Sequence, residues 1–299
     1  MRVLIVGCGY VGLPLGIELV RLGHEVFGLR RNSARANELK SAGIQPLFAD
    51  ITKLEELNKL PRDFDWVVNC VAANGADYSE TYLRGTKNLM AWLENSPPKK
   101  FIYTSSTSVY GQDDGSPVKE TSPTEPLAET SKVLVQTEKV LFAAFAEKNF
   151  PVVILRVAGI YGPDRGHLFK QFLKNEARID GDGARFLNMI HRDDVVGCII
   201  SALKSGRAGE IYNVVDDEPV SQLNFLVWLA GTLGKYPPPS EPENLEARKR
   251  GATNKRVSNR KLKMELGYPF KHPNFRSGYS AEILRLDRAG ELHIAPDVR

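Results

Sequence analysis

The sequence predicts an α/β fold, with a doubly wound parallel sheet and a smaller C-terminal substrate lobe. Short apolar runs alternate with segments of helical periodicity from Met1 to about Val157, and nearly every residue of those runs is apolar. Strands that alternate with helices pair in parallel, and strands that are apolar on both faces are covered by helices on both sides. A glycine-rich turn directly after the first run is typical of a Rossmann-type sheet.

Six apolar runs, rich in β-branched residues, are the expected strands of this sheet. Helical spacing follows the first run, where Val11, Leu15 and Leu19 recur on one face. A longer amphipathic stretch, 134–146, precedes the sixth run, and a further strand at 211–215 is expected to return to the sheet. The six expected strands are residues 3–6, 25–29, 45–48, 66–71, 100–104 and 152–157.

The regular alternation weakens after the sixth run, where glycine and proline residues interrupt it. A Pro-rich loop or linker, YPPPSEPEN, follows at 236–244. We therefore expect two units, a nucleotide-binding domain and a smaller lobe that closes over the substrate. The domain would comprise residues 1–161 plus about 184–215, and the lobe would comprise about 162–183 and 216–299.

Composition excludes several classes of protein. No run of about 18 apolar residues exists and the first residues enter a strand directly, so we expect a cytoplasmic protein with no membrane partner. The formal net charge of +4 is too small and too dispersed to indicate a nucleic-acid partner. Cys8, Cys70 and Cys198 lie far apart without a CxxC pair, so neither a disulfide framework nor a zinc site is expected.

The glycine-rich turn has the pattern of a dinucleotide-binding loop. Gly7, Gly9 and Gly12 form GxGxxG around Tyr10 and Val11, between a strand and a helix. The three glycines serve a tight turn, close approach of the backbone to a pyrophosphate, and packing of the helix on the strand. The N-terminal N–H groups of the helix would then face the phosphates. The alternative is a glycine turn without a ligand.

The end of the second strand favours NADP(H) over NAD(H). An NAD-selective site places an acidic residue there, but this chain has Arg30 and Arg31. A pair of guanidinium groups suits a ribose 2′-phosphate, although a solvated basic turn is the alternative. Asp50 and Ile51, after the third strand, would lie near the adenine.

Seven segments carry a resemblance to a known family. They are NCVAAN, RGTKNL, TSSTSVYG, RVAGIYGP, MIHRDDV, GEIYNVVDDEPVS and NKRVSNRKLKMELGY. In order and spacing they resemble the extended short-chain dehydrogenase/reductases, the NAD-dependent epimerase/dehydratase family. The loop alone also resembles that of sugar dehydrogenases that oxidise an alcohol to an acid, but those need a longer chain and a nucleophilic cysteine in a later domain. Most extended members carry GxxGxxG, so this chain resembles an atypical branch.

The resemblance implies a catalytic serine and lysine but no catalytic tyrosine. In the family a Ser or Thr polarises a substrate oxygen, a Tyr exchanges its proton, and a Lys four residues later holds the nicotinamide ribose. The matching positions are Ser106, with Ser105 and Thr107 as alternatives, and Lys132, whereas Ala128 stands where the tyrosine belongs. The family also usually has Asn where Tyr82 and Gly159 stand, so the site is altered at more than one position.

Two functions follow from the missing tyrosine. The first is an oxidoreductase or epimerase/dehydratase-like enzyme that acts on a sugar-type or other carbonyl or hydroxyl substrate, with its proton supplied by Glu129, Tyr110, Tyr161 or water. The second is a non-catalytic NADP(H)-binding sensor or scaffold. A further alternative within the first function is a slow hydride transfer that relies on proximity and Ser106 alone. The sequence leaves these alternatives open.

The resemblance also implies the remaining site residues. Val71, Ala72, Ala73, Thr104 and Lys132 would contact the cofactor. Ser106, Thr107 and Arg256 would contact the substrate, and Arg256 would meet the diphosphate of a nucleotide sugar, unless its basic stretch, 248–263, is only a solvated surface. His191, Asp193 and Asp194 are expected to be structural, and no metal is expected. Many relatives form homodimers through a four-helix contact, and Met90, Leu134 and Leu141 lie on the helices that would make it.

Overall fold

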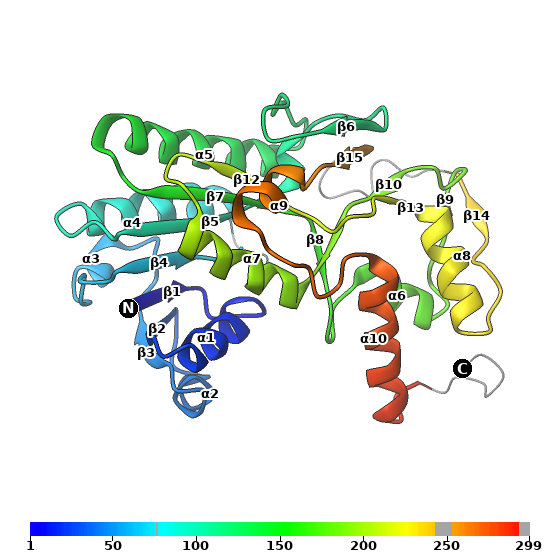
Figure 1. Cartoon of the computed structure of the whole chain (residues 1–299), viewed down its shortest axis with the longest axis horizontal. Helices are drawn as coiled ribbons and strands as arrows, with labels where there is room; N and C mark the ends of the chain where they lie inside the picture. Colours follow the sequence, from blue (N-terminus) through cyan, green and yellow to red (C-terminus); the bar gives the residue numbers. More distant parts are fainter. Residues whose placement is uncertain (74, 76, 243–252, 293–299) are drawn as a thin grey trace.

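The computed structural model describes residues 1–73, 75, 77–242 and 253–292. Its centre is a seven-stranded sheet in the order β12-β7-β5-β4-β1-β2-β3, and every pairing in it is parallel (Figure 1). The strands are β1 (Arg2–Val6), β2 (Glu25–Arg30), β3 (Gln45–Phe48), β4 (Trp66–Asn69), β5 (Lys100–Ser106), β7 (Val152–Val157) and β12 (Ile211–Val214). This confirms the predicted fold class, and each predicted strand lies within two residues of its observed bounds.

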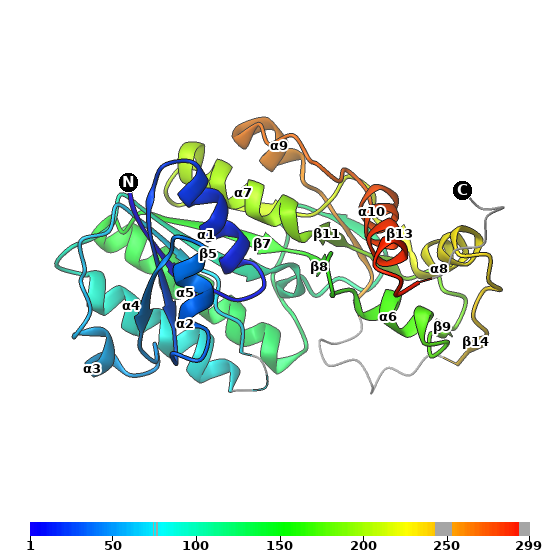
Figure 2. The same cartoon turned by 90° about the horizontal axis from the view of Figure 1, so that it is seen from below.

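Helices cover both faces of the sheet because both faces of its strands are apolar. Figure 2 shows α1 and α7 on one side of the sheet and α4 and α5 on the other. Leu15 and Leu19 of α1 and Ile199 of α7 belong to one core cluster, whereas Leu89 of α4 and Leu141 of α5 belong to the other. The helices are α1 (Gly12–Arg21), α2 (Ala36–Ser41), α3 (Leu54–Leu57), α4 (Gly85–Leu93), α5 (Glu129–Lys148), α6 (His167–Leu173), α7 (Arg192–Ser205), α8 (Gln222–Thr232), α9 (Arg260–Leu266) and α10 (Phe275–Arg288). A π-helical turn, η1 (Ser79–Arg84), leads directly into α4, and a short 3₁₀ turn, η2 (Thr107–Val109), follows β5.

A third core cluster lies to one side of the sheet. Phe169 of α6, Phe225 of α8 and Tyr279 of α10 are buried together there, in the part drawn on the right of Figure 1. Short two-stranded pairings connect the surrounding segments. They are β8 (Gly159–Tyr161) with β11 (Met189–His191), β9 (Ile179–Asp180) with β14 (Ser240–Glu241), β10 (Phe186–Leu187) with β13 (Val220–Ser221), and β6 (Ser116–Val118) with β15 (Lys255–Val257).

The segment from β15 through α9 does not pack in this third cluster. Val257, Leu262 and Leu266 are buried in the core cluster of α1 and α7, although the sequence pattern assigns them to the smaller lobe. Their apolar side chains cover the face of the sheet beside β12. The division into two domains stays a prediction, and this segment belongs by its packing with the sheet.

Two helix residues named for a homodimer contact are buried inside the chain. Leu134 and Leu141 of α5 are 5% and 0% exposed, so a contact between copies along α4 and α5 would use other side chains. No helix in the described part of the chain has the length and apolar character that crossing a bilayer requires.

Candidate functional site

The loop between β1 and α1 uses each of its three glycines differently. A Cβ on Gly7, whose φ is +93°, would lie 2.9 Å from the backbone of Val71, and a Cβ on Gly12 would lie 2.3 Å from the carbonyl oxygen of Gly7. A Cβ on Gly9 would meet no atom within 4 Å. Gly7 and Gly12 therefore allow close packing inside the protein, whereas Gly9 keeps open the space that a ligand would enter.

The donors of this loop fit an anionic ligand. The backbone N–H groups of Tyr10, Val11 and Gly12 make no hydrogen bond to any residue that the structure describes. The first turn of α1 contains no acidic side chain and its N-cap residue provides no side-chain acceptor. Unpaired N–H groups and the positive end of the helix dipole favour a phosphate there. The loop thus fits the pyrophosphate of a dinucleotide.

The cysteine of the loop is a thiol and not a nucleophile. Cys8 is 1% exposed and burial raises its pKa to about 12, with the nearby Arg30 guanidinium opposing that shift. Burial also raises the pKa of Cys198 well above its usual range. Both groups keep their protons near neutral pH, so neither has the properties of a thioester-forming cysteine.

The two arginines at the end of β2, Arg30 and Arg31, differ in their surroundings. Arg30 donates from Nη1 to the Cys8 carbonyl oxygen at 2.9 Å and lies 3.8 Å from Glu38 Oε2, so it supports the glycine loop. Arg31 is exposed. Asp50, at the end of β3, accepts hydrogen bonds from the Thr52 N–H and hydroxyl groups; burial opposes ionisation of Asp50, but these bonds outweigh it and lower its pKa. Arg31 is thus the more accessible of the two arginines.

Two further arginines surround the glycine loop, and the sequence analysis did not find them. Tyr10 donates its hydroxyl proton to the Pro163 carbonyl oxygen at 3.0 Å, and the guanidinium carbons of Arg165 and Arg192 lie 4.9 and 5.3 Å from its ring centroid. These side chains come from the turn after β8 and from the start of α7. No local pattern in the sequence links these positions to residue 10, because only the tertiary fold brings them together.

Strand β5 ends in alternating hydroxyl groups that point to opposite sides. Ser105 donates to Glu138 Oε1 at 2.6 Å, and Glu138 pairs with Arg156 at 2.7 Å, with both side chains 5% exposed. Ser106 accepts a hydrogen bond from the Ser108 N–H at 3.1 Å and caps η2. Alternation along a strand therefore directs Ser105 into a buried charge network and Ser106 toward the end of the sheet.

Ser106 lines a small pocket of about 40 Å³ between η1, β5 and α5. The other lining residues are Tyr78, Tyr82, Thr104, Ser105, Ser108, Thr130 and Leu134. The structure thus brings Thr104 and Ser106 together, and their expected contacts with cofactor and substrate stay predictions. Tyr78 and Thr130 were not found from the sequence, and the signal for Tyr82 was its departure from the family's usual asparagine.

Lys132 does not line this pocket. Ala128 precedes α5 directly, and Lys132 Nζ lies 2.7 Å from Glu129 Oε1 on the outer side of the first helical turn. The two side chains are 48% and 85% exposed. The role of Lys132 toward a nicotinamide ribose stays a prediction, and Glu129 faces solvent.

The two alternative tyrosines lie in closed interior networks. Tyr110 is 0% exposed, and its hydroxyl donates to Asn213 Oδ1 at 2.7 Å and accepts from Arg156 Nη1 at 2.9 Å. Tyr161 is 1% exposed, with its ring stacked 4.2 Å from that of Tyr279. Burial raises the pKa of both phenols. Neither tyrosine lines the pocket, so this geometry does not favour either as a proton donor to a ligand.

Arg256 lies in β15, far along the chain from the serine block. Its Nε donates to the Gly115 carbonyl oxygen at 2.9 Å, and its guanidinium lies 5.5 Å from the centroid of the Phe186 ring. Residues 248–252 of the basic stretch lie outside the described residues. Its neighbour Lys255 is buried and donates to the Tyr110 carbonyl oxygen at 2.9 Å, and burial together with Arg185 lowers its pKa to about 8. A contact of Arg256 with a substrate diphosphate stays a prediction.

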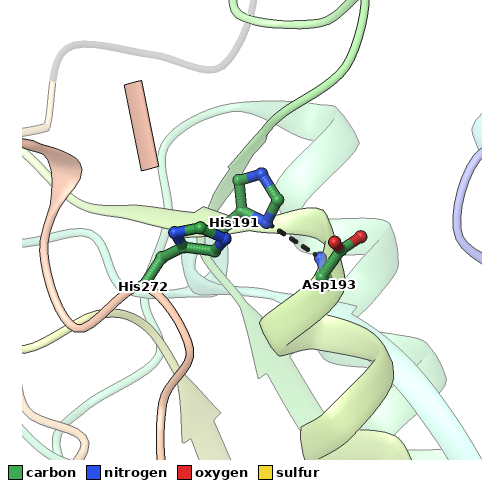
Figure 3. Close-up of side chains that lie close together, drawn as sticks. All are labelled: His191, Asp193 and His272. Atoms are coloured by element: carbon green, nitrogen blue, oxygen red, sulfur yellow. Dashed lines mark hydrogen bonds between the residues drawn. The ribbon is translucent and has the colours of Figure 1, made fainter. Parts of the chain in front are cut away.

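His191, Asp193 and His272 lie close together, with one possible ligand atom of each within 4.8 Å of the others (Figure 3). The protein uses these groups itself. His191 Nδ1 accepts from the Asp193 N–H at 3.2 Å and caps α7, and Arg192 pairs with the Asp193 carboxylate at 3.0 Å. Figure 3 shows that carboxylate pointing away from both rings. We assign no metal to this cluster.

Asp194 joins the start of α7 to the segment before α10. Its carboxylate is fully buried and accepts hydrogen bonds from the Tyr268 hydroxyl and from the N–H groups of Lys271 and His272. This carboxylate holds the two segments together, in line with the structural role expected for the HRDD motif.

Comparisons with known proteins agree with this geometry. The model of the NAD-dependent epimerase/dehydratase family matches residues 3–215. Protein YeeZ of Escherichia coli (strain K12) is 29% identical over 281 residues, which cover 91% of this chain and 97% of YeeZ. The 3-diazoavenalumate denitrifying reductase of a Streptomyces species is 25% identical, over 94% of this chain and 100% of the reductase.

A solved structure has the same fold. The dTDP-glucose 4,6-dehydratase DesIV of Streptomyces venezuelae, with NAD bound, superposes with a TM-score of 0.82 over 97% of each chain. At 24% identity this likeness shows the fold alone.

Proposed function

Because the chain belongs to the NAD-dependent epimerase/dehydratase family, we propose that it is an oxidoreductase that prefers NADP(H) and acts on a carbonyl or hydroxyl group of a small molecule. The observation that carries this proposal is the glycine loop. Its unpaired N–H groups at residues 10–12 and the open space at Gly9 fit a dinucleotide pyrophosphate. When bound, the nicotinamide of such a dinucleotide exchanges a hydride with the substrate carbon.

Ser106 would bind the reacting oxygen of the substrate. Its Oγ accepts from the Ser108 N–H, which fixes the hydroxyl and leaves its proton for a second oxygen. A hydrogen bond to that oxygen polarises a carbonyl and stabilises the charge that develops on it. Thr104, whose hydroxyl donates to the Asn69 carbonyl oxygen at 3.1 Å, supports the neighbouring wall of the pocket.

The preference for NADP(H) rests on the end of β2. Arg31 is exposed there and Arg30 is held against the glycine loop, so a 2′-phosphate would meet positive charge. DesIV has NAD bound, but its identity to this chain is too low to transfer the choice of cofactor.

The substrate we propose is of the sugar type, and a nucleotide sugar is the first class to test. DesIV acts on a dTDP-sugar, and Arg256 would be the residue to meet a diphosphate. The second class is a smaller molecule that is not a nucleotide sugar, because the Streptomyces reductase, whose whole length matches this chain, is named for 3-diazoavenalumate.

A second candidate function is a non-catalytic NADP(H)-binding protein. The methyl side chain of Ala128 has no acidic proton to transfer. Lys132 Nζ lies 2.7 Å from Glu129 Oε1 on the outside of α5. Both observations favour a protein that keeps the cofactor site without the family's proton transfer.

The first experiment is to denature the purified protein and identify the released small molecules by mass spectrometry. NADP(H) together with a nucleotide sugar or another carbonyl metabolite would support the enzyme and identify its substrate class. NADP(H) alone would favour the binding protein, and the next step would be turnover with NADPH of two carbonyl probes, dTDP-4-keto-6-deoxyglucose and 9,10-phenanthrenequinone. If the protein binds neither NADPH nor NADH in titrations, the proposal is wrong.

A further inference from the structure

The pocket beside Ser106 contains two phenols but no carboxyl, amino or imidazole group. Its residues are Tyr78, Tyr82, Thr104, Ser105, Ser106, Ser108, Thr130 and Leu134. A phenol is a stronger acid than the hydroxyl of serine or threonine. A group in this pocket that gives a proton to a ligand oxygen is therefore one of the two tyrosines.

The π-helical turn η1 is the reason that these tyrosines reach the pocket. Tyr82 lies within η1 and Tyr78 immediately precedes it, and their ring centroids are 5.0 Å apart. The turn packs against α5, whose Thr130 and Leu134 form the opposite wall. Wide turns of this kind are frequent at functional sites. The turn thus brings phenols beside the start of α5, where Ala128 provides none.

Tyr82 is the better placed of the two. Its hydroxyl oxygen accepts a hydrogen bond from the Ala73 N–H at 3.4 Å, in the segment after β4 that is expected to contact the cofactor. The Tyr82 ring also packs against the core cluster of α1 and α7. These contacts hold the phenol oxygen beside the expected cofactor segment, and the Tyr82 side chain lines the same pocket as Ser106.

A third polar group in the pocket indicates a ligand. Thr130 Oγ1 is buried without a hydrogen-bond partner among the described residues, although buried hydroxyl groups nearly always have one. A volume of about 40 Å³ has room for a few groups of the size of a water molecule, such as a carbonyl oxygen, and not for a sugar ring. The pocket therefore fits the reacting oxygen of a substrate and leaves the rest of the substrate outside.

From this arrangement we infer that Tyr82 is the catalytic proton donor, in place of the tyrosine that the family has at position 128. The inference rests on the proposed oxidoreductase function. As the carbonyl carbon receives a hydride from a reduced nicotinamide dinucleotide, the second electron pair of the C=O bond moves onto oxygen. The O–H bond of Tyr82 breaks while the new O–H bond of the product forms, and the phenolate regains a proton from water.

The test is Tyr82→Phe, which removes only the hydroxyl group. With NADPH and either carbonyl probe, kcat should fall about 100-fold to 10,000-fold, the range for loss of a general acid. The KM and the Kd for NADPH should change less than threefold, because the ring stays in place. Tyr236→Phe is the matched control. It removes the same hydroxyl group from a tyrosine that is 94% exposed and does not line the pocket.

The possible results separate the two proposals. A parent protein that reduces a probe, with Tyr82→Phe equally active, would overturn the proton-donor role alone. A parent protein that binds NADPH but reduces neither probe would overturn the enzymatic proposal and the role of Tyr82 with it.

A second variant keeps the test decisive if Tyr82→Phe does not fold. Difluorotyrosine at position 82 preserves the ring and the hydroxyl but makes the phenol more acidic. The high-pH decline of kcat should then shift to lower pH in this variant, because the donor loses its proton earlier. An unshifted decline would contradict the assignment.

Discussion

At the scale of single residues, neighbours in the sequence have separate tasks. Ser105 and Ser106 both line the pocket, but the Ser105 hydroxyl donates to the buried Glu138, whereas the Ser106 hydroxyl accepts from the Ser108 N–H and caps η2. Arg30 supports the glycine loop through the Cys8 carbonyl oxygen, whereas Arg31 is exposed. Substitutions at adjacent positions should therefore affect stability and ligand binding differently.

Ser106→Ala should lower kcat about 100-fold to 1,000-fold for any carbonyl probe that the protein reduces, since it removes one donor to the charged oxygen. The Kd for NADPH should stay within threefold of the parent value. Steady-state kinetics with NADPH measure both, and Ser205→Ala at the exposed end of α7 is the control. Equal turnover in Ser106→Ala would rule out the assigned role.

Arg31→Asp should weaken NADPH binding about 10-fold to 100-fold, because a charge-assisted hydrogen bond to the 2′-phosphate is lost. Binding of NADH should change less than threefold. Fluorescence titration measures both constants, and Arg62→Asp is a control for the change in net charge at a half-buried site. Arg30→Asp should also weaken NADPH relative to NADH, but with added damage to the loop. Equal losses for both cofactors in Arg31→Asp would contradict a 2′-phosphate site.

At the scale of elements, the candidate site depends on how β1, the glycine loop and α1 pack together. At Gly7 and Gly12 this packing leaves no room for a side chain. The contact of α1 with β1 depends on the absence of a side chain at residue 12, and the path of the loop depends on the positive φ of Gly7. In the same way η1 is wide enough to bring Tyr82 to the pocket. A change in the packing of the glycine loop or of η1 should therefore change ligand binding directly.

Gly12→Ala should destabilise the fold by about 1–3 kcal/mol and weaken NADPH binding more than 10-fold, because the new Cβ would lie 2.3 Å from the Gly7 carbonyl oxygen. Urea denaturation and fluorescence titration measure the two effects. Gly231→Ala in α8 is the matched control, since a Cβ there meets nothing within 4 Å. That control should stabilise the protein by about 0.5–1 kcal/mol through helix propensity. A stable, fully binding Gly12→Ala protein would show that the loop tolerates displacement.

At the scale of the whole molecule, the sheet and the third core cluster are joined through the start of α7. Asp194 binds the 268–272 segment, and His191 lies in contact with Tyr161 and His272 from other elements. Burial, and then the proximity of His272, lower the pKa of His191 to about 4. The folded state therefore favours the uncharged form of His191, and protonation of this residue should destabilise the fold.

Stability should fall as the pH decreases from about 6.5 to about 4. In that window the unfolded chain takes up a proton on His191 that the folded chain does not, so the free energy of unfolding decreases. Urea denaturation at pH 7, 6, 5 and 4.5 measures it. His191→Asn preserves an N-cap acceptor but cannot titrate, so it should lose correspondingly less stability.

Comparing the parent protein with His191→Asn also cancels the contribution of Asp216 to the pH dependence of stability, which has the opposite sign. Burial raises the pKa of that carboxyl, which favours the folded state at low pH to the same extent in both proteins. Parallel pH profiles of the parent and His191→Asn would contradict the account.

Much of the fold and part of the site could be predicted from the sequence. Strand positions were predictable because a strand buried on both faces needs a continuous apolar run, and the loop was predictable because its glycines lie within six residues. Arg165, Arg192, Tyr78 and Thr130 were not predictable, because they lie on other elements and have ordinary local surroundings. The packing of α9 against the sheet escaped prediction for the same reason.

The sequence by itself determined the parallel sheet, the dinucleotide loop, the arginines after the second strand and the absence of a tyrosine at position 128. Each depends on residue type and on spacing along a short stretch of chain. Only the tertiary structure decided which hydroxyl groups line the pocket, that Glu129, Tyr110 and Tyr161 lie elsewhere, and that Tyr82 lines the same pocket as Ser106. Those relations depend on how helices pack against the sheet, and packing joins residues that no local pattern connects.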